Sequence, residues 1–540
     1  MMKTKLIYVF LSLVLLSACS GEDYDSPLRQ GDEALQLSAR VSSFVIDGAP
    51  DTRADDSDEK TAFEEGDRMG IIVLDKDGEI LSDNIPYIYS GSAWSFDGNS
   101  NEGKVAVNYN NRARTYLAYF PYTKQADGIK NIEDLKKKFQ PLLDQRSKDT
   151  YRASDLLVWS TSDNTPLKKL EINFEHAYCL LSFPSSVSIT CNINESSTEV
   201  TYSSSLISDV SFTLNGNPYS AYKAADGSHR IITTPLSISA SDRWFATYNA
   251  NKAYSGSMSA TTLAEKTRYT LAPSLSIGNY SLDEVRVGDF YCKDASGNGY
   301  LIPGEVASLT DDQKTACIGI VCCTDANRIG EAAKTALSGK SVTTPHGLVM
   351  ALTNASEGCQ WGVYNKDENS DGSDGTPFKD NTNNLQKMYH NVDGYAETHW
   401  MFEKLTNGGY SSDTYKAFAA ARDYSVAVPN NATGWFIPSM GQWWDILSNL
   451  GGIDLTDFQE STNSSTSLSG AAETAIKNMN KYLDKINGAT TFSKDTHFWS
   501  SSEYSSDNAC YVGFGSGGNL YLDYCNKGGT LIRVRCVLAF

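Results

Sequence analysis

The residues that could perform chemistry in this chain are scattered, and none of their spacings matches a catalytic or metal centre. The pair Cys317 and Cys322 lies on an apolar segment typical of a strand. Side chains alternate between the two faces of a strand, so these thiols face opposite ways and do not suit a shared metal. The six histidines include no His-x3-His pair, and no G-x-S-x-G elbow accompanies a Ser/His/Asp set. We therefore expect no enzyme, no catalytic residue and no cofactor.

A loop of acidic and amide residues is the best candidate for binding a cation. Oxygen-bearing side chains stand at Asp367, Asn369, Asp371 and Asp374, as in the first half of a calcium loop. The twelfth position is Phe378, where an EF-hand has a bidentate Glu, so an EF-hand is excluded. A calcium loop of another type and a solvated Asp/Gly/Ser loop both remain open, and the second is favoured.

Cys19 has the clearest predicted chemistry, because of the residues before it. Lys3 and Lys5 precede the apolar run 6–16. A helix that crosses a bilayer needs about 20 residues, so this run predicts a secretory signal instead. The sequence Leu-Ser-Ala-Cys at 16–19 resembles the lipobox of bacterial lipoproteins. That resemblance implies cleavage before Cys19 and diacylglycerol on its thiol; an ordinary secretory signal with a chance cysteine is the alternative.

The acidic pair Glu22 and Asp23 is similar to the surface-export signal of lipoproteins from Bacteroidetes. The similarity implies a lipid-anchored protein on the outer face of the cell outer membrane. The net charge of −19 would repel phosphate backbones, so nucleic-acid binding is not expected. An oxidising compartment permits disulfides. Cys179 and Cys191 could bridge a hairpin, whereas the eight cysteines of the last half leave their pairing open or are buried thiols.

The distribution of strands and helices predicts three blocks in a chain too long for one core. We expect a signal peptide at 1–18, an acidic tether at 19–34, β-sandwiches at 35–165 and 166–275, a linker at 276–282 and a mixed α+β domain at 283–540. Alternating apolar residues predict strands at 35–47, 69–74, 87–90, 104–107 and 116–120. Helices are expected at 132–139, 326–338, 413–424, 441–450 and 471–486, and late strands at 509–514, 520–524 and 531–538.

Five short segments, in order, resemble the fimbrillin family of Bacteroidetes. They are Phe-Glu-Glu-Gly-Asp-Arg-Met-Gly-Ile at 63–71, Trp94, Tyr-Leu-Ala-Tyr-Phe-Pro-Tyr at 116–122, Ser-Asp-Leu-Leu-Val at 154–158 and Phe-Glu-His-Ala at 174–177. The resemblance implies two transthyretin-like seven-stranded sandwiches. It also implies assembly by β-strand addition, in which a neighbouring fimbrillin subunit supplies a strand to a groove left by the removed first strand.

The resemblance places the proteolytic processing site between Arg53 and Ala54, in the acidic segment after the 35–47 strand. Arg40 would cut inside that strand, and Arg68 lies beyond the acidic segment. The alternative is that Arg53 is only a solvated loop charge. Without cleavage, the chain is better interpreted as a basal anchor subunit.

The last block resembles a different family, the major paralogous domain of secreted bacterial proteins. The matching segments are Trp-Phe-Ile-Pro-Ser at 435–439 with Gln442-Trp443, Phe-Trp-Ser-Ser-Ser-Glu at 498–503, 509–514 and Arg-Val-Arg-Cys-Val at 533–537. The resemblance implies a C-type-lectin-like or sulfatase-modifying-factor-like fold. The sugar-binding triplets of calcium-dependent lectins are absent, so a structural role for the motifs is favoured. Trp361, Trp443 and Trp444 could stack on sugars if exposed, but core packing is preferred.

The sequence thus predicts a mainly β protein, a fimbrial tip or accessory adhesin. Its expected partners are other fimbrillin subunits, and a glycan or protein of host or microbe at the last block. The membrane would be reached through the lipid anchor only. Two alternatives remain open: a monomeric surface glycan-binding lipoprotein, and, less favoured, an enzyme of the formylglycine-generating type.

Overall fold

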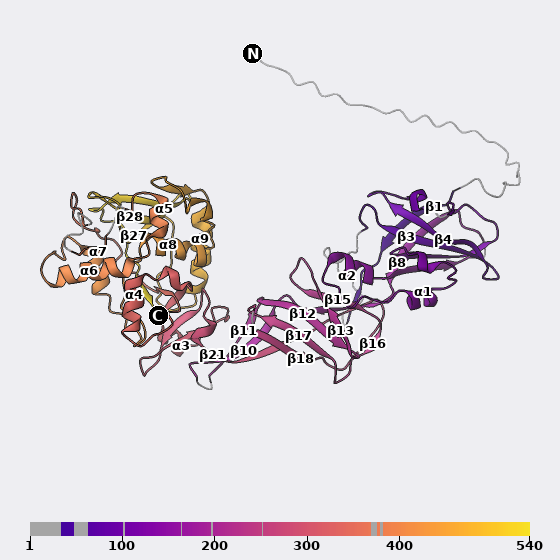
Figure 1. Ribbon diagram of the computed structural model, residues 1–540, viewed down its shortest axis with the longest axis horizontal. Helices are drawn as coiled ribbons and strands as arrows, with labels where there is room; N and C mark the ends of the chain where they lie inside the picture. Colours follow the sequence, from indigo (N-terminus) through magenta and orange to yellow (C-terminus); the bar gives the residue numbers. More distant parts are fainter. Residues whose placement is uncertain are drawn as a thin grey trace, which may run out of the picture. The chain divides into compact units, whose positions relative to one another are not determined.

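The computed structural model describes residues 34–47, 63–100, 103–163, 165–195, 198–250, 252–368, 375–378 and 382–540. The chain falls into two compact units. The first takes the described residues up to Phe183 together with Asp209–Phe245 and Ser255–Leu271, and the second takes Pro184–Ser208, Ala246–Tyr254 and Ala272–Phe540. Figure 1 colours both units along the sequence. Each is described by itself below.

A seven-stranded sheet forms the frame of the first unit, in the order β1-β8-β7-β6-β3-β4-β5. Strand β1 runs parallel to β8, and the other neighbours in this sheet are antiparallel. β8, which we expected to open the second sandwich, therefore lies in the first sheet. The strands are β1 (Gln36–Val41), β3 (Arg68–Asp75), β4 (Ile80–Tyr89), β5 (Trp94–Phe96), β6 (Ala113–Phe120), β7 (Leu157–Ser162) and β8 (Lys169–His176).

Strands β3 and β6 are buried on both faces, which explains their nearly continuous apolar sequences. On β3, Met69, Ile71 and Val73 join one hydrophobic core, and Ile72 and Leu74 join another. The first core lies on the face that β1 and β8 also line. The sheet therefore separates two cores within one unit.

Two short helices cover part of the second core. Helix α1 (Ile132–Lys138) confirms the helix expected at 132–139, and its Leu135 is fully buried. The Asn131 side chain caps α1 by accepting a hydrogen bond from the Asp134 amide at 2.8 Å. Helix α2 (Lys148–Ser154) was not expected; Ser147 caps it in the same way.

Further sheets follow the first. A five-stranded sheet has the order β14-β15-β9-β20-β2, a four-stranded sheet the order β13-β12-β17-β18, and β16 pairs with β19. The strands are β2 (Val45–Ile46), β9 (Cys179–Phe183), β12 (Ile207–Leu214), β13 (Asn217–Ser220), β14 (Tyr222–Lys223), β15 (His229–Thr233), β16 (Leu236–Ser237), β17 (Arg243–Tyr248), β18 (Lys252–Ser257), β19 (Thr262–Leu263) and β20 (Thr267–Thr270).

Three sheets lie in the second unit, in the orders β11-β10-β21, β23-β22-β24-β25-β30 and β26-β29-β28-β27. The expected linker at 276–282 is mostly strand β21, which pairs with β10. The strands are β10 (Val187–Ile193), β11 (Glu199–Ser204), β21 (Ser274–Tyr280), β22 (Phe290–Lys293), β23 (Gly299–Ile302), β24 (Cys317–Cys323), β25 (Leu348–Ala351), β26 (Thr466–Leu468), β27 (Thr496–Glu503), β28 (Asn508–Phe514), β29 (Leu520–Asn526) and β30 (Val537–Ala539).

Most helices of the described residues belong to the second unit and gather around its sheets (Figure 1). They are α3 (Asp311–Ala316), α4 (Glu331–Ser338), α5 (Leu385–His390), α6 (Gly394–Thr406), α7 (Lys416–Arg422), α8 (Met440–Asp445) with the π turn Ile446–Leu450, and α9 (Ala471–Leu483). The expected helices at 326–338, 413–424, 441–450 and 471–486 are confirmed with shorter bounds. None of the described helices combines the length and the apolar character that a bilayer crossing requires.

Two expected strands differ in the structure, and a disulfide that the sequence left open is not formed. Residues 104–107 form no strand: Val105 is 71% exposed, and the segment meets residues 34–35 only through the Leu35 amide on the Val107 carbonyl at 3.1 Å and a bridge from Asn108 to Ala34. The late strand at 531–538 shortens to β30, since Leu531 is 86% exposed. Cys179 and Cys191 do not bridge a hairpin: both are free, as are all ten cysteines of the described residues.

Candidate functional site

Strand β1 is the first candidate site, because it occupies the edge of the seven-stranded sheet, where β8 is its one partner strand among the described residues. The Gln36 amide donates to the Lys168 carbonyl at 3.1 Å, and the Ser42 amide donates to the Phe174 carbonyl at 2.9 Å. On the outer side, Arg40 donates to the Asn173 side chain at 3.0 Å. The backbone ladder thus fixes the register of β1.

The side chains of β1 hold it less firmly than those of its neighbour. Leu37, Ala39 and Val41 point into the first core but are only half-buried. The facing stripe of β8 is almost fully buried: Leu170 is 1%, Ile172 1% and Phe174 0% exposed. Full burial of a large apolar side chain contributes about 1.5–3 kcal/mol, and half-burial contributes less. β1 is therefore a weakly held strand over a strongly apolar groove.

The segment that follows β1 reaches a second sheet of the same unit. Phe44 stacks on His176 with ring centroids 3.6 Å apart. β2 then runs parallel to β20, where the Val45 amide donates to the Lys266 carbonyl at 2.7 Å. Val45 is nevertheless 53% exposed. Residues 34–47 thus form the edge of two sheets; Leu35 is buried in the first core, and the other side chains are half-buried or exposed.

His176 has a structural role that its place in the Phe-Glu-His-Ala motif did not reveal. Its Nδ1 lies 2.8 Å from a carboxylate oxygen of Asp155, and both groups are buried. Asp155 follows α2, whereas His176 ends β8. The pair therefore connects two of the segments that resemble fimbrillins, 154–158 and 174–177.

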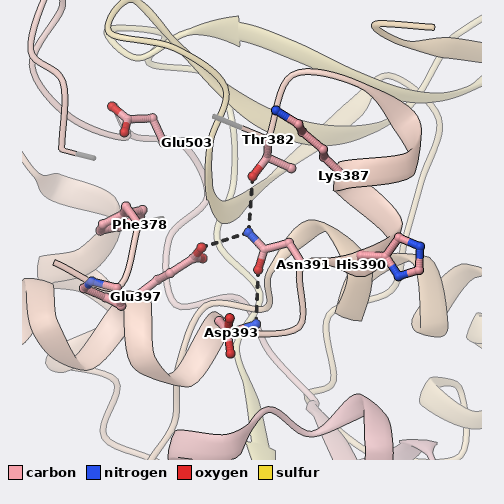
Figure 2. A pocket seen from close by; sticks show the side chains of 9 residues that line it. Phe378, Thr382, Lys387, His390, Asn391, Asp393, Glu397 and Glu503 are labelled. Carbon is pink, nitrogen blue, oxygen red and sulfur yellow. Dashed lines mark hydrogen bonds between the residues drawn. The ribbon is translucent and has the colours of Figure 1, made fainter. Parts of the chain in front are cut away.

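The second candidate site is a pocket in the second unit, shown in Figure 2. Its cavity volume of about 190 Å³ is smaller than that of most sites for drug-sized molecules, which exceed about 300 Å³. Helices α5 and α6, the turn between them and the end of β27 supply most of the lining, which consists of Pro377, Phe378, Thr382, Lys387, His390, Asn391, Asp393, Glu397 and Glu503. The lining carries three carboxyl groups, so the pocket is suited to a ligand that donates hydrogen bonds.

Asn391 organises this pocket, as Figure 2 shows. Its side-chain nitrogen donates to Glu397 at 2.9 Å and to Thr382 at 3.3 Å. Its side-chain oxygen accepts from the Asp393 amide at 3.1 Å. The second carboxylate oxygen of Glu397 accepts from the Ser501 hydroxyl. Burial raises the pKa of Glu397 to about 7, although both hydrogen bonds oppose the rise.

Glu503 belongs both to the pocket lining and to a buried ionic cluster. We call Glu368, Tyr415, Glu503 and Lys527 the lysine cluster. The Lys527 ammonium donates to Glu368 at 2.5 Å and also to Glu503. The three charged side chains are at most 1% exposed. Burial, followed by a hydrogen bond to Glu368, raises the pKa of Glu503, while Lys527 opposes the rise.

Most of the sequence-predicted site residues lie outside the described residues. These are Cys19, Arg53, Ala54, Asn369, Asp371 and Asp374, so lipidation, processing and the calcium loop stay predictions. Asp367 is described and is half-buried beside Glu368. The described residues contain no group of three His, Cys, Asp or Glu side chains that could hold a metal.

The tryptophans proposed for sugar stacking are core residues. Trp361 and Trp443 are 0% exposed and Trp444 is 1% exposed, which confirms the preferred interpretation. The Trp361 indole donates to the Ser500 carbonyl at 2.8 Å, and the Trp443 indole donates to the Trp499 carbonyl at 3.1 Å. These tryptophans therefore hold the 498–503 motif in place rather than face a ligand.

The residues of the 435–443 motif also have structural roles. The hydroxyl of Ser439 and the side chain of Gln442 form a capping box at the start of α8. Gln442 also donates to the Val392 carbonyl at 3.0 Å, which fixes the turn before α6. Cys317 and Cys322 are buried, and their thiols donate to the carbonyls of Gly319 and Leu348. No chemistry beyond packing follows from these residues.

Sequence reasoning missed the residues that line the pocket and form the lysine cluster. Glu397 stands on α6, whose mixed aromatic and polar sequence has no clear apolar period. Glu368 and Lys527 are 159 residues apart. The sequence contained one indication of the lysine cluster. Glu503 ends a run of buried residues on β27, and a buried charged group needs a partner.

Residues 52–286 match the family described as fimbrillin-like. A Bacteroides ovatus protein named as a fimbrium tip subunit, Fim1C, is 24% identical to this chain over 95% of each protein. A fimbrial protein from B. ovatus of known crystal structure has 20% identity and a TM-score of 0.35, over 94% of this chain and 99% of that chain. Another solved B. ovatus protein, described as a cell adhesion protein, has 14% identity and a TM-score of 0.30, over 45% of this chain and 93% of that chain. Residues 52–286, somewhat less than half of the chain, are thus similar to the fimbrillin-like family.

Proposed function

We propose that this chain is a fimbrial subunit, an adhesin at the tip or in an accessory position, that receives a strand from a neighbouring subunit at the edge held by β1. The observation that carries the proposal is the half-buried β1 over the buried stripe of β8, a strand that lies within the residues similar to fimbrillins. An unpaired sheet edge beside an apolar groove is the structure that accepts a foreign strand.

The position at the tip is supported by two observations. The relative that spans 95% of this chain is named as a fimbrium tip subunit. In this chain, residues 537–540 lie in the core of the second unit, with Val537, Leu538 and Ala539 all 0% exposed. That segment is therefore not free to fill a neighbour's groove. The subunit would accept a strand without offering this one.

Processing after Arg53 is part of the proposal. A cut there would detach residues 34–47, which include β1, Phe44 and β2, from the rest of the chain. The detached segment would leave readily because its side chains are mostly half-buried or exposed. Leu170, Ile172 and Phe174 would then line the groove that the incoming strand fills.

Attachment to the cell surface through lipid on Cys19 completes the proposed pathway. Before assembly the acylated chain would reside on the outer face of the outer membrane. The second unit would then present its pocket to a glycan or protein ligand. The acidic lining supports a ligand rich in hydrogen-bond donors.

The test is to analyse fimbriae purified from the source bacterium, together with an Arg53→Ala strain and an Arg112→Ala control strain. Arg112 is exposed and lies outside the acidic segment. We expect chains that begin at Ala54 in wild-type and control fimbriae, and far fewer chains of this protein in Arg53→Ala fimbriae. N-terminal sequencing and immunoblotting measure both. Full-length chains in wild-type fimbriae, or equal incorporation of the Arg53→Ala protein, would contradict the proposal.

A second candidate function is a monomeric surface glycan-binding lipoprotein that is never cleaved. One observation favours it: β1 is seated in register over all six of its residues. This candidate predicts an intact chain on the cell surface and no copies in fimbriae, so the same purification separates the two.

A further inference from the structure

The lysine cluster poses a problem of charge that ion pairing alone does not solve. Counted with their backbone atoms, Lys527 is 0% exposed, Glu368 3% and Glu503 2%. One ammonium group faces two carboxyl groups, so a fully ionised cluster would leave one negative charge without a partner in a dry interior. Such a charge costs several kcal/mol. The raised pKa of Glu503 indicates that the cluster keeps a proton instead.

We infer that Lys527 and Glu368 become joined by an intramolecular amide bond, with Glu503 carrying the proton and Tyr415 holding the carbonyl oxygen. The Lys527 nitrogen lies 2.5 Å from one oxygen of Glu368. The other oxygen of Glu368 accepts from the Tyr415 hydroxyl at 2.5 Å. The amine, the carboxyl group and a donor to the carboxyl are thus in contact before any reaction.

All three hydrogens of the Lys527 ammonium have acceptors. Glu368 and Glu503 take two, the Lys366 carbonyl accepts the third, and the Trp361 ring centroid lies 5.0 Å from the nitrogen. The side chains of Lys527 and Glu368 are both 0% exposed. In so dry a site, transfer of a proton from an ammonium to a carboxylate removes two charges and is less costly than in water.

The reaction balances without any external reagent. Glu503 starts protonated. It passes its proton to the Glu368 carboxylate and takes a new proton from the Lys527 ammonium. The neutral amine then attacks the Glu368 carboxyl carbon, while the Tyr415 hydroxyl stabilises the oxygen that becomes negative. Glu503 takes a proton from the nitrogen and returns one to the leaving oxygen. A C–N bond forms, a C–O bond breaks, and one water molecule leaves.

The bond would have a mechanical consequence for the second unit. Glu368 precedes the segment that supplies Phe378 to the pocket, and Lys527 directly follows β29. The two residues are 159 positions apart. A covalent link between them would fasten the pocket wall to the sheet and restrict the unfolded chain, as a cross-link over a long loop does.

The experiment is protease digestion of the denatured full chain, followed by mass spectrometry. We expect the peptide that contains Glu368 to be joined to the peptide that contains Lys527, one water mass below their sum. Lys527→Met should give two separate peptides. Glu503→Gln should slow the joining about a hundredfold or more, the usual contribution of a proton carrier. Separate wild-type peptides of full mass would overturn the inference and leave a buried ion cluster only.

Two further variants sharpen the assignment. Glu368→Gln should still join, but with loss of ammonia, because an amide then supplies the leaving group; loss of water would make Glu503 the acceptor and refute the stated roles. Lys485→Met is the matched control. Lys485 donates to the carbonyls of Gly304 and Val306, at 3.0 and 2.7 Å, and its nitrogen lies 5.8 Å from the Phe290 ring centroid. Its replacement should leave the joined peptide unchanged; loss of the joined peptide would indicate an effect of folding and count against the roles given to Lys527.

Discussion

The strands β1 and β30 are held in opposite ways. β1 has one neighbour and alternates between exposed and half-buried side chains. β30 pairs with β25, bridges to Phe436 and has every side chain buried. The longer strand is therefore the more weakly held, because the hold on a strand depends on how much of each side chain the rest of the unit covers. This difference fits a subunit that accepts a strand at β1 and keeps β30.

The largest effect is expected from Leu538→Ala in β30. Leu538 is 0% exposed, and removing its side chain leaves a cavity that costs about 2–5 kcal/mol. Urea unfolding followed by amide hydrogen exchange of the β25 and β30 peptides would measure the loss. Leu531→Ala is the control, because Leu531 is 86% exposed and should change stability by less than about 0.5 kcal/mol. Equal losses of stability in both variants would contradict the view that burial of its side chains holds β30 in place.

The next effect concerns pH and the pocket of the second unit. Burial raises the pKa of Glu397 to about 7, so the folded protein holds a proton that the unfolded chain releases near its ordinary value of 4.5. The free energy of unfolding should therefore fall by about 1–3 kcal/mol as pH rises from about 4.5 to 7. Above pH 7 it should level off.

The variant Glu397→Gln should remove this part of the pH dependence, since the amide cannot lose a proton. Hydrogen exchange of α6 peptides at several pH values would report it. Glu403→Gln on the same helix is the control, because Glu403 is exposed. If Glu397→Gln keeps the wild-type slope, the buried carboxyl group is not what titrates.

The smallest effect is expected at β1 itself. Leu37→Ala removes a half-buried side chain from the first core, which should cost about 1 kcal/mol, less than the change in β30. It should also increase exchange of the β1 amides and the rate of strand replacement. Val105→Ala, at a residue 71% exposed, is the control in the same unit. A cost as large as that of Leu538→Ala would show that β1 is a permanent part of the sheet.

Regular strands and helices were the most predictable part of this fold. Met69–Leu74 and 116–120 have runs of apolar residues that suit only buried strands, and both are strands. The half-buried strand at 35–47 was recognised by alternation, although it divides into β1 and β2. Val105 and Leu531 misled the prediction for one reason: an apolar residue in a local pattern does not report whether a partner strand is present.

The candidate sites were less predictable, because their residues come together from distant segments. Asn391, Glu397 and Glu503 line one pocket but share no motif. Trp361 and Trp443 could be assigned to the core from their apolar neighbours, and their burial confirms this. The sequence left the cysteine pairing open because the compartment permits a disulfide without requiring one, and the cysteines of the described residues are free.

The sequence by itself determined the similarity of residues 52–286 to fimbrillins, the mainly β character and the structural role of the late tryptophans, since these follow from local order and composition. Only the tertiary structure decided which strand is weakly held and which residues share the lysine cluster. Burial and pairing depend on long-range contacts, and one strand or one charge acquires its stability from neighbours that the local sequence does not contain.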